Sequence, residues 1–347
     1  MFNKSAVELI MKIISLFNHK GGVCKTTTVY HLGWKLMQKR KRVLLIDTDS
    51  QCNLSLTAIG EDCYEKFLQD EPDNNIKSCL DVAFKSKPQL IPVPNCIRVK
   101  GNDGLFLLPG NFDITEFEVQ LGISFQLSNS FSTMNSLPGS FYYLIRRCSE
   151  VFNIDYVLID MNPSLSAINQ DLISISDYFI LPTSPDYFSH MAIKSMARVL
   201  PQWENWAQQA RVVFADSTYP MPNIKPKFLG YTVNDYNIRK GKPTAAFSSI
   251  ITKTSNIIED ILYPELEKVG MTIDKAQYIN NSLCLASLSN FQHLMPKYQE
   301  YGLPVFVLSP DQIGATGVIL NEQLAKQKEF DNIYESFADN VIKLTSL

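Results

Sequence analysis

The chain has 347 residues, enough for one large or two ordinary domains, and its apolar fraction of 45% and charged fraction of 19% are typical of a soluble globular protein. A formal net charge of −3 excludes the overall basic character that indicates nucleic-acid or membrane binding, although a local basic face stays open. The seven cysteines form no C-x-x-C pair, which argues against a zinc site and a disulfide framework and favours a reducing cytosol.

The two ends of the chain carry no membrane signal. Met1–Met11 contains Glu8 and lacks the long apolar segment of a signal peptide, so we expect a short extension or helix there. Phe330–Leu347 has Lys343 as its only basic residue, unlike an amphipathic membrane helix, and no apolar run reaches the length of a span. We therefore expect a cytoplasmic protein without a membrane anchor.

The first segment with a chemical signature is FNHKGGVCKTTT, at Phe17–Thr28. An apolar, β-branched run precedes it at Lys12–Phe17, and a helix-like stretch follows over Thr27–Arg40. Phosphate-binding loops are built in this way, because the backbone N–H groups of the turn and the dipole of the helix face the phosphate. A lysine then neutralises the phosphate charge and a hydroxyl holds Mg²⁺. The segment therefore predicts a nucleotide phosphate site.

This loop departs from the strict pattern G-x-x-x-x-G-K-[ST], because His19 and Cys24 stand where the two glycines are expected. It reads K-G-G-x-x-K-T instead, from Lys20 to Thr26. A chance Gly-Gly turn is the alternative. The number of matching positions between a strand and a helix makes that alternative the weaker one.

Two later apolar runs each end in an acid, RVLLID at Arg42–Asp47 and DYVLID at Asp155–Asp160. Continuous apolar runs of this length are typical of strands that are buried on both faces. Carboxylates at the carboxyl ends of such strands can hold Mg²⁺ through water and orient a nucleophilic water. Asp49, two residues after the first run, adds a third carboxylate. An ordinary acidic turn is the alternative for each run taken alone.

Together these segments resemble the ParA/MinD family of ATPases, whose deviant Walker A loop usually reads K-G-G-x-G-K-[ST]. The second strand of that family ends D-x-D-P-Q-x-N, which DTDSQCN matches except at Ser50. Its Walker B segment D-Y-V-[IL]-[IL]-D-x-P-P matches DYVLIDMNP except at Asn162. The resemblance covers most of the chain and is strongest over Lys12–Asn53 and Asp155–Asp186. It implies an α/β fold, a mostly parallel sheet flanked by helices, with nucleotide at the carboxyl ends of the strands.

The resemblance also implies a role for each matching residue. Lys25 reaches the β- and γ-phosphates of ATP, Thr26 ligates Mg²⁺, and Thr27 contacts the α-phosphate. The whole phosphate cradle is Gly21, Gly22, Val23, Cys24, Lys25, Thr26 and Thr27.

The remaining implied roles concern turnover and the metal. Asp49 orients the attacking water, and Asp47 and Asp160 supply the outer shell of the Mg²⁺, with support of Thr26 as a second role for Asp160. Lys20 reaches across an ATP-sandwich dimer to the partner's phosphates. The implied catalytic residues are therefore Lys20, Lys25 and Asp49, and ATP binding would drive dimerisation. Cys24 is a departure from the family glycine, and its thiol beside Lys25 and a helix N-terminus is expected to favour the thiolate.

Asn234 is a further candidate, for the nucleotide base. It ends a predicted strand, FLGYTVN at Phe228–Asn234. Members of the family often place an adenine-contacting asparagine in such a G-x-x-x-N segment. A capping asparagine is an equally open alternative.

One α/β domain with an insertion around 60–139 is favoured over two domains, because the nucleotide motifs run from Lys20 to Asn234 without a Gly/Ser linker. The other expected elements are helices at Cys63–Leu68, Ser78–Lys85, Asp113–Leu121, Phe141–Phe152, His190–Leu200, Gln202–Ala210, Phe247–Val269, Ser289–Tyr301 and Glu322–Leu344, strands at Ile97–Val99, Leu105–Leu108, Asp177–Pro182 and Gln277–Ile279, and a surface loop at Ser124–Pro138.

The resemblance implies a dimerising ATPase that serves DNA partition or a related mobile-element function, with a ParB-like or other protein partner left open. Nonspecific DNA binding is weakly supported, since Arg239–Lys242 is the one basic cluster found in that part of the chain. A nucleotide-gated interaction module with little turnover is the alternative, which Cys24 and Ser50 favour. A metabolic ATP-dependent ligase or reductase is a third and weaker alternative, because no substrate motif is present.

Overall fold

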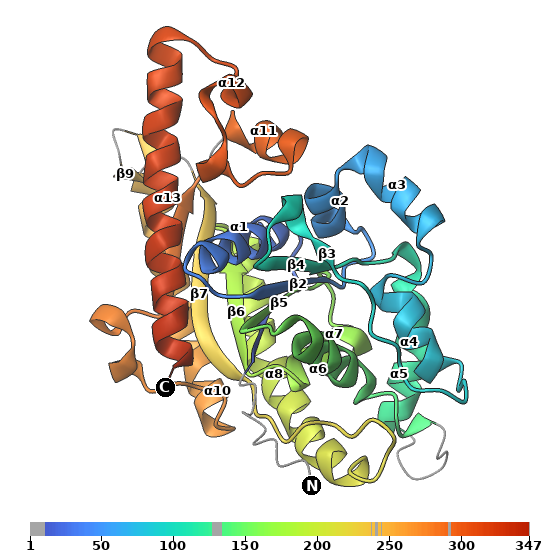
Figure 1. Cartoon of the computed structure of the whole chain (residues 1–347). Helices are drawn as coiled ribbons and strands as arrows, with labels where there is room; N and C mark the ends of the chain where they lie inside the picture. Colours follow the sequence, from blue (N-terminus) through green and yellow to red (C-terminus); the bar gives the residue numbers. More distant parts are fainter. Residues whose placement is uncertain are drawn as a thin grey trace, which may run out of the picture.

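The computed structural model describes residues 11–126, 134–236, 238–239, 242–243, 245–290 and 293–346. The predicted extension before Met11 and the middle of the predicted loop at Ser124–Pro138 lie outside these residues. An eight-stranded sheet organises the rest, in the order β10-β7-β6-β1-β5-β2-β4-β3 (Figure 1). Every neighbouring pair is parallel except β3 and β4, so the predicted fold class is confirmed. The strands are β1 (Lys12–Leu16), β2 (Val43–Asp47), β3 (Ile97–Arg98), β4 (Leu105–Leu108), β5 (Tyr156–Asp160), β6 (Tyr178–Thr183), β7 (Lys227–Tyr236) and β10 (Cys284–Ser289), and β8 (Ile238–Arg239) pairs with β9 (Lys242–Pro243) in a separate hairpin.

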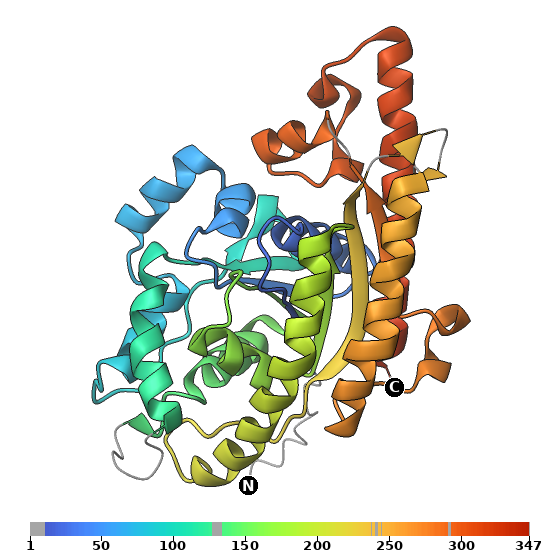
Figure 2. The ribbon, with the colours of Figure 1, turned by 180° about the vertical axis from the view of Figure 1, so that it is seen from behind.

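Helices cover both faces of the sheet, which explains why its central strands are continuous apolar runs. All residues of β2 and β5 are buried. Helices α1 and α13 lie on one face, and α6, α7 and α8 lie on the other (Figures 1 and 2). The helices are α1 (Lys25–Gln38), α2 (Asn53–Ile59), α3 (Glu61–Asp70), α4 (Ile76–Phe84), α5 (Phe117–Gln126), α6 (Ser140–Phe152), α7 (Ala167–Ser174), α8 (Tyr187–Val213), α9 (Ala245–Ile257), α10 (Tyr263–Lys268), α11 (Leu294–Tyr301), α12 (Pro310–Ile313) and α13 (Gly317–Thr345).

Helix α1 lies very close to the sheet because Gly33 has no side chain. A Cβ added at Gly33 would stand 2.6 Å from Cδ2 of Leu45 on β2, which is shorter than any stable contact. The first turn of α1 is thereby held at the carboxyl edge of β1 and β5. This placement is what brings the candidate phosphate loop beside the acids that end the central strands.

Two expectations for the second half of the chain are wrong. The strand expected at Gln277–Ile279 is replaced by two 3₁₀ turns, and the neighbouring strand is β10, parallel to β7. The break expected at Pro201 is absent, because α8 continues through it. Leu200 and Trp203 are buried on either side of this proline, so tertiary packing holds the helix together despite the missing N–H. The predicted helix at Phe247–Val269 is confirmed, with a π-helical turn between α9 and α10.

The predicted insertion contributes more than surface loops. Its predicted strands at Ile97–Val99 and Leu105–Leu108 are confirmed as β3 and β4, which pair antiparallel, and β4 also extends the main sheet beside β2. The predicted C-terminal helix is also confirmed and begins earlier, at Gly317. Helix α13 packs along α1 and β10, so the last element of the chain lies directly beside the helix that follows the phosphate loop (Figure 1).

Candidate nucleotide site at the carboxyl edge of the sheet

The loop between β1 and α1 is held in shape by Asn18 and by two left-handed residues. The buried Asn18 donates from Nδ2 to the carbonyl oxygen of Pro182 at 2.8 Å and accepts the N–H of Lys20 at 2.9 Å. Gly22 has φ 70° and Cys24 has φ 60°. The left-handed conformation costs a residue with a side chain about 1–2 kcal/mol, so Cys24 is strained where the family glycine would not be.

The two lysines of the loop point to different partners. Lys25 is buried, and its Nζ donates to the carbonyl oxygens of Asn18 at 3.1 Å and Lys20 at 3.3 Å. Burial lowers the pKa of Lys25, while Asp160 and Asp49 oppose that shift. Lys20 instead forms an ion pair with Asp186, the residue that caps the N-terminus of α8. The loop therefore has one lysine inside the site and one directed across its surface.

The strand register brings two of the predicted metal-site acids together. Asp47 and Asp160 are paired across β2 and β5 and are both buried. Both oxygens of Asp160 lack a hydrogen-bond partner of normal geometry among the described residues, although the nearby Thr26 hydroxyl favours its ionised form. Burial, with a smaller contribution from Asp47, raises the pKa of Asp160 well above its usual range. A buried carboxyl group of this kind fits a cation, because a positive charge would remove the cost of its ionisation.

Asp47 is less available than Asp160. Its Oδ2 accepts the N–H of Ser55 at 2.8 Å and the Ser55 hydroxyl at 2.7 Å, and burial raises its pKa to about 6. Asp49 lies farther out, where its Oδ1 accepts the N–H of Gln51 at 3.0 Å and its side chain faces the loop across a cavity. The arrangement therefore suits Asp47 to an outer metal shell and Asp49 to a water or phosphate group in the cavity.

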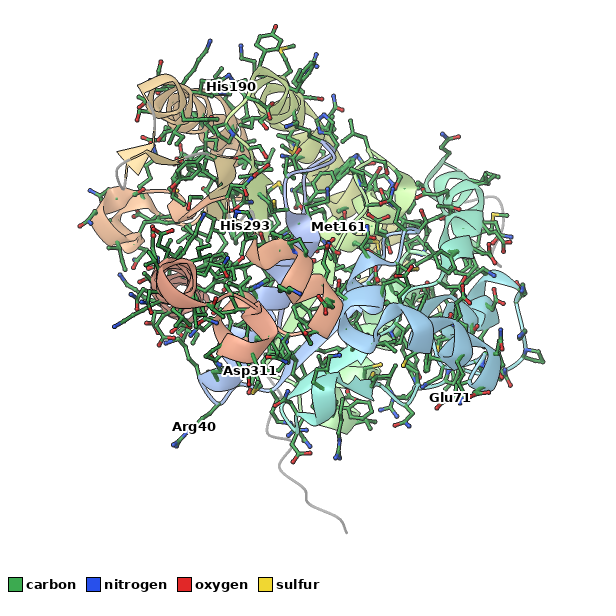
Figure 3. All side chains as sticks on the ribbon, turned by 90° about the horizontal axis from the view of Figure 1, so that it is seen from above. Arg40, Glu71, Met161, His190, His293 and Asp311 are labelled. Carbon is green, nitrogen blue, oxygen red and sulfur yellow. The ribbon has the colours of Figure 1, made fainter. Side chains whose placement is uncertain are left out.

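Two cavities meet at the loop, and Cys24 and Thr27 line both. Figure 3 looks down on this edge of the sheet, with Met161, the residue after β5, near the middle of the view. The first cavity has a volume of about 610 Å³, and the second has about 400 Å³, so each is in the size range of small-molecule sites. The first is bounded by the loop Gly21–Thr27, by α2, by Asp49 and by Tyr298 of α11.

The second cavity contains Asn234, at the carboxyl end of β7. Asn234 Nδ2 donates to the carbonyl oxygen of Val23 at 2.9 Å and to the Thr232 hydroxyl at 3.0 Å. Its Oδ1 is buried without a hydrogen-bond partner among the described residues. Because both N–H groups are used, this side chain offers a ligand an acceptor and no donor. A ligand that fills the second cavity can satisfy this oxygen with a hydrogen-bond donor such as an N–H group.

Sequence reasoning missed the walls that come from the C-terminal part of the chain. These are Tyr298 in the first cavity and Leu288, Asn290, Met295 and Tyr334 in the second. No local motif marks them, and they lie far from the loop in sequence.

The expectation that the surroundings of the Cys24 thiol favour its thiolate is wrong. Burial, and then Asp235, raise the pKa of Cys24 to about 11, although Lys20 and Lys25 both act in the opposite direction. Desolvation outweighs the two cations because it penalises the thiolate itself. Cys24 therefore contributes its backbone and a neutral thiol to the loop.

The basic cluster Arg239–Lys242 coincides with the hairpin of β8 and β9, whose two central residues lie outside the described part of the chain. Within the described ranges, no helix has the length and apolar character needed to cross a membrane.

The amino-acid sequence also matches a known protein family and known proteins. The family model described as an AAA domain matches residues 11–210, more than half of the chain. A protein of Methanocaldococcus jannaschii is 28% identical over 274 residues, which are 77% of this chain and 88% of that protein. A ParA family protein of Chlamydia muridarum is 29% identical over 250 residues, which are 70% of this chain and 79% of that protein.

Solved structures share the fold over nearly the whole chain. A Corynebacterium diphtheriae protein matches with a TM-score of 0.70 and 20% identity, covering 96% of this chain and 99% of that one. An ATP complex of a McdA variant from Cyanothece matches with a TM-score of 0.57 and 15% identity, covering 97% of both chains. The pNOB8 ParA bound to nonspecific DNA matches with a TM-score of 0.55 and 19% identity, covering 97% of this chain and 99% of that one.

Proposed function

Because the chain belongs to the ParA-like family of P-loop ATPases, we propose that it binds Mg-ATP, forms an ATP-dependent homodimer and hydrolyses ATP. The observation that carries this proposal is the convergence at one cavity of the phosphate loop, the buried Lys25 and Asp49, with the buried carboxyl group of Asp160 close to Lys25 and Thr26. We further propose that the whole chain acts as one domain around this site, with residues 60–139 as an insertion.

The two cavities suit the two ends of a nucleotide. The N–H groups of Gly21–Thr27 and the ammonium of Lys25 would hold the phosphates in the first cavity. The base would enter the second cavity, where the free acceptor of Asn234 is matched by the 6-amino group of adenine. Guanine carries a carbonyl oxygen at that position, which would face the Oδ1 of Asn234 and place two acceptors against each other. This geometry supports ATP as the nucleotide.

Hydrolysis would use Asp49, which lines the first cavity, and the buried acids behind the loop. Asp49 would orient the attacking water, because its carboxylate lines the first cavity and is not part of the phosphate loop. Thr26 and Asp160, with Asp47 behind them, are the residues that would hold Mg²⁺. When bound, Mg²⁺ supplies neutralisation of the phosphate charge. Lys25 would keep the β- and γ-phosphates in place during the reaction.

An apolar surface beside Lys20 supports dimerisation on this face. Tyr187, Phe188 and Met191 at the start of α8 are 65%, 72% and 49% exposed, and Leu165 after β5 is 45% exposed. Strands β6, β1 and β5 are neighbours in the sheet, so these side chains flank Lys20 at the same edge. A second copy related by two-fold symmetry would cover this surface with its own equivalent and bring Lys20 to the partner's phosphates.

The biological process that fits best is DNA partition or a related mobile-element function in the cytoplasm. Its support is the family and the likeness of the fold to ParA and McdA. Nonspecific DNA, through the basic segment Arg239–Lys242, and a ParB-like or other protein are the partners that we propose. The strained Cys24 favours one alternative, a nucleotide-gated interaction module with little turnover.

Turnover of ATP and molecular mass with and without Mg-ATP test the proposal together. We expect slow hydrolysis, a monomer without nucleotide, and a dimer with Mg-ATP in light scattering. Phe188→Ser should weaken the dimer, and Val212→Ser, which changes an apolar side chain 77% exposed near the other end of α8, should not. A dimer with no measurable hydrolysis, with or without DNA, would favour the gated module. No nucleotide binding at all would overturn both functions.

A further inference from the structure

His31 of α1 makes two hydrogen bonds, one buried and one partly buried, that fix its protonation state. Its Nδ1 lies 2.8 Å from the carbonyl oxygen of Thr27, and its Nε2 lies 3.0 Å from the backbone nitrogen of Val305. The N–H of Val305 can only donate, so Nε2 is the acceptor and Nδ1 carries the proton. The imidazole is fully buried, and burial lowers its pKa to about 3, in keeping with the neutral form.

The contact at Val305 continues to the C-terminal helix. The carbonyl oxygen of Val305 accepts a hydrogen bond from Nε2 of Gln327 at 2.7 Å, and the same nitrogen donates to the carbonyl oxygen of Leu308 at 2.8 Å. Gln327 belongs to α13 and lines neither of the two cavities at the loop. A chain of polar contacts therefore runs from Thr27 through His31 and Val305 to Gln327, across the interior of the protein. We call it the Thr27–Gln327 relay.

The ring of His31 also supports both cavities of the nucleotide site. Its centroid lies 4.8 Å from that of Tyr298, which lines the first cavity. It lies 5.3 Å from that of Tyr334, which lines the second. Thr27, whose carbonyl oxygen it contacts, lines both. One imidazole thus touches a wall residue of each cavity and the residue that they share.

We propose that His31 and Gln327 are positioning residues of the nucleotide site, and that the Thr27–Gln327 relay makes nucleotide affinity depend on the docking of the segment 294–313 against α1. The proposal rests on the proposed function for the identity of the ligand. It goes beyond that function because it assigns a role in binding to residues that touch no nucleotide. The ring of His31 packs against Tyr298 and Tyr334, which are walls of the two cavities. Val305 in turn forms a hydrogen bond to His31, and Gln327 forms one to Val305.

The physical reason is that the hydrogen bonds of the relay depend on one another. Loss of the His31 acceptor leaves the N–H of Val305 buried without a partner, which is costly unless the segment moves to reach water. Movement of the segment shifts Tyr298, because α11 and Val305 belong to the same connection. The first cavity then changes shape although none of its own residues has been substituted.

Two substitutions at His31 separate packing from hydrogen bonding. His31→Phe keeps an aromatic ring among its neighbours and removes both hydrogen bonds. His31→Asn can still donate to the Thr27 carbonyl oxygen but is too short to reach Val305. We expect both to raise the Kd for Mg-ATP at least tenfold, measured by titration calorimetry of the full chain. Leu36→Ala, a buried change on the same helix, should lower the thermal midpoint comparably and leave the Kd within twofold.

Gln327→Ala tests the relay from its far end. It should raise the Kd for Mg-ATP about threefold to tenfold, and Glu329→Ala, at an exposed position on the same helix, should not change it. Unchanged affinity in His31→Phe and Gln327→Ala would overturn the proposal and leave the proposed function intact. If the parent protein binds no Mg-ATP under the same conditions, the proposed function fails and the inference fails with it. An equal loss of affinity in Leu36→Ala would assign the effect to stability alone and also overturn it.

Discussion

The phosphate loop and the C-terminal segment 294–313 bound the same first cavity, but they are built in opposite ways. The loop is local, since residues 18–28 supply its own glycine turn, its own lysines and the helix that it opens. The C-terminal segment reaches the cavity only through distant contacts, in which Tyr30 donates to the carbonyl oxygen of Gly302 at 2.6 Å and His31 meets Val305. The comparison teaches that the phosphate-binding part of the site is encoded in one stretch, whereas the shape of the site is encoded across the whole chain.

Among the substitutions that would sharpen this comparison, we expect the largest effect from those of the two lysines in the loop. Lys25→Ala should weaken Mg-ATP binding about 100-fold or more, roughly 2.7 kcal/mol, because the β- and γ-phosphates lose their buried counter-ion. Titration calorimetry measures this, with Lys41→Ala, beyond the far end of α1, as the control. Lys20→Ala should leave monomer binding intact and impair dimerisation and turnover. If Lys20→Ala dimerises and hydrolyses ATP like the parent, the role of Lys20 in the partner's site is wrong.

The next largest effect concerns chemistry and not binding. Asp49→Ala should reduce the rate of ATP hydrolysis about 100-fold while ATP still binds and the dimer still forms, because the residue orients water in the first cavity. A steady-state assay and light scattering on the same sample check both parts. Loss of ATP binding would recast Asp49 as part of the metal site, and full activity would remove it from the mechanism.

A pH dependence separates the C-terminal wall from the loop. The folded pKa of His31, about 3, is far below its unfolded value near 6.5, so the stability that the neutral imidazole contributes is present above pH 6.5 and is lost as the pH falls towards 3. Between pH 6.5 and pH 5 this loss is about 2 kcal/mol. Asp47, whose pKa is raised to about 6, acts in the opposite direction in both the parent and a variant.

Chemical denaturation should therefore show a smaller stability difference between the parent and His31→Phe at pH 5 than at pH 7. A difference that does not change with pH would mean that His31 is charged or exposed in the folded protein, and would remove it from the buried wall.

Substitution of Asn234, in the cavity proposed for the base, should have a smaller effect, and the same cavity should distinguish ATP from GTP. Asn234→Asp presents acceptors only and removes the donors that reach Val23 and Thr232, so affinity for ATP should fall about tenfold. The parent should prefer ATP over GTP, because the buried Oδ1 needs the 6-amino group of adenine. Competition binding measures the preference. Equal affinity for the two nucleotides would place the base outside the second cavity.

The smallest effect is expected at Cys24. Cys24→Gly relieves a left-handed cysteine, so turnover should stay within threefold of the parent or rise. Mg-ATP should also protect Cys24 from alkylation, which mass spectrometry of the labelled peptide can follow at mildly alkaline pH. A collapse of turnover in this variant would show that the thiol is required. Alkylation at the same rate under saturating Mg-ATP would place Cys24 outside the site.

What could be predicted from the sequence follows the same division between local and distant structure. The loop, the buried strands that end in Asp47 and Asp160, and the parallel sheet were predicted because each is written in one short stretch with a known physical cause. The strand β10 and the continuity of α8 were not, because packing against other elements overrides their local signals. The role of His31 depends on Val305, 274 residues away in the sequence, so no local motif marks it.

Hydrogen exchange of the full chain with and without saturating Mg-ATP tests most directly the claim that the loop and the C-terminal segment form one nucleotide site. The account predicts slower exchange at residues 18–28 and also at residues 294–308, with no change at residues 263–275, which pair with the first residues of β7 at its amino end. Protection confined to the loop would contradict the shared site and the relay through His31. The absence of protection anywhere would contradict nucleotide binding itself.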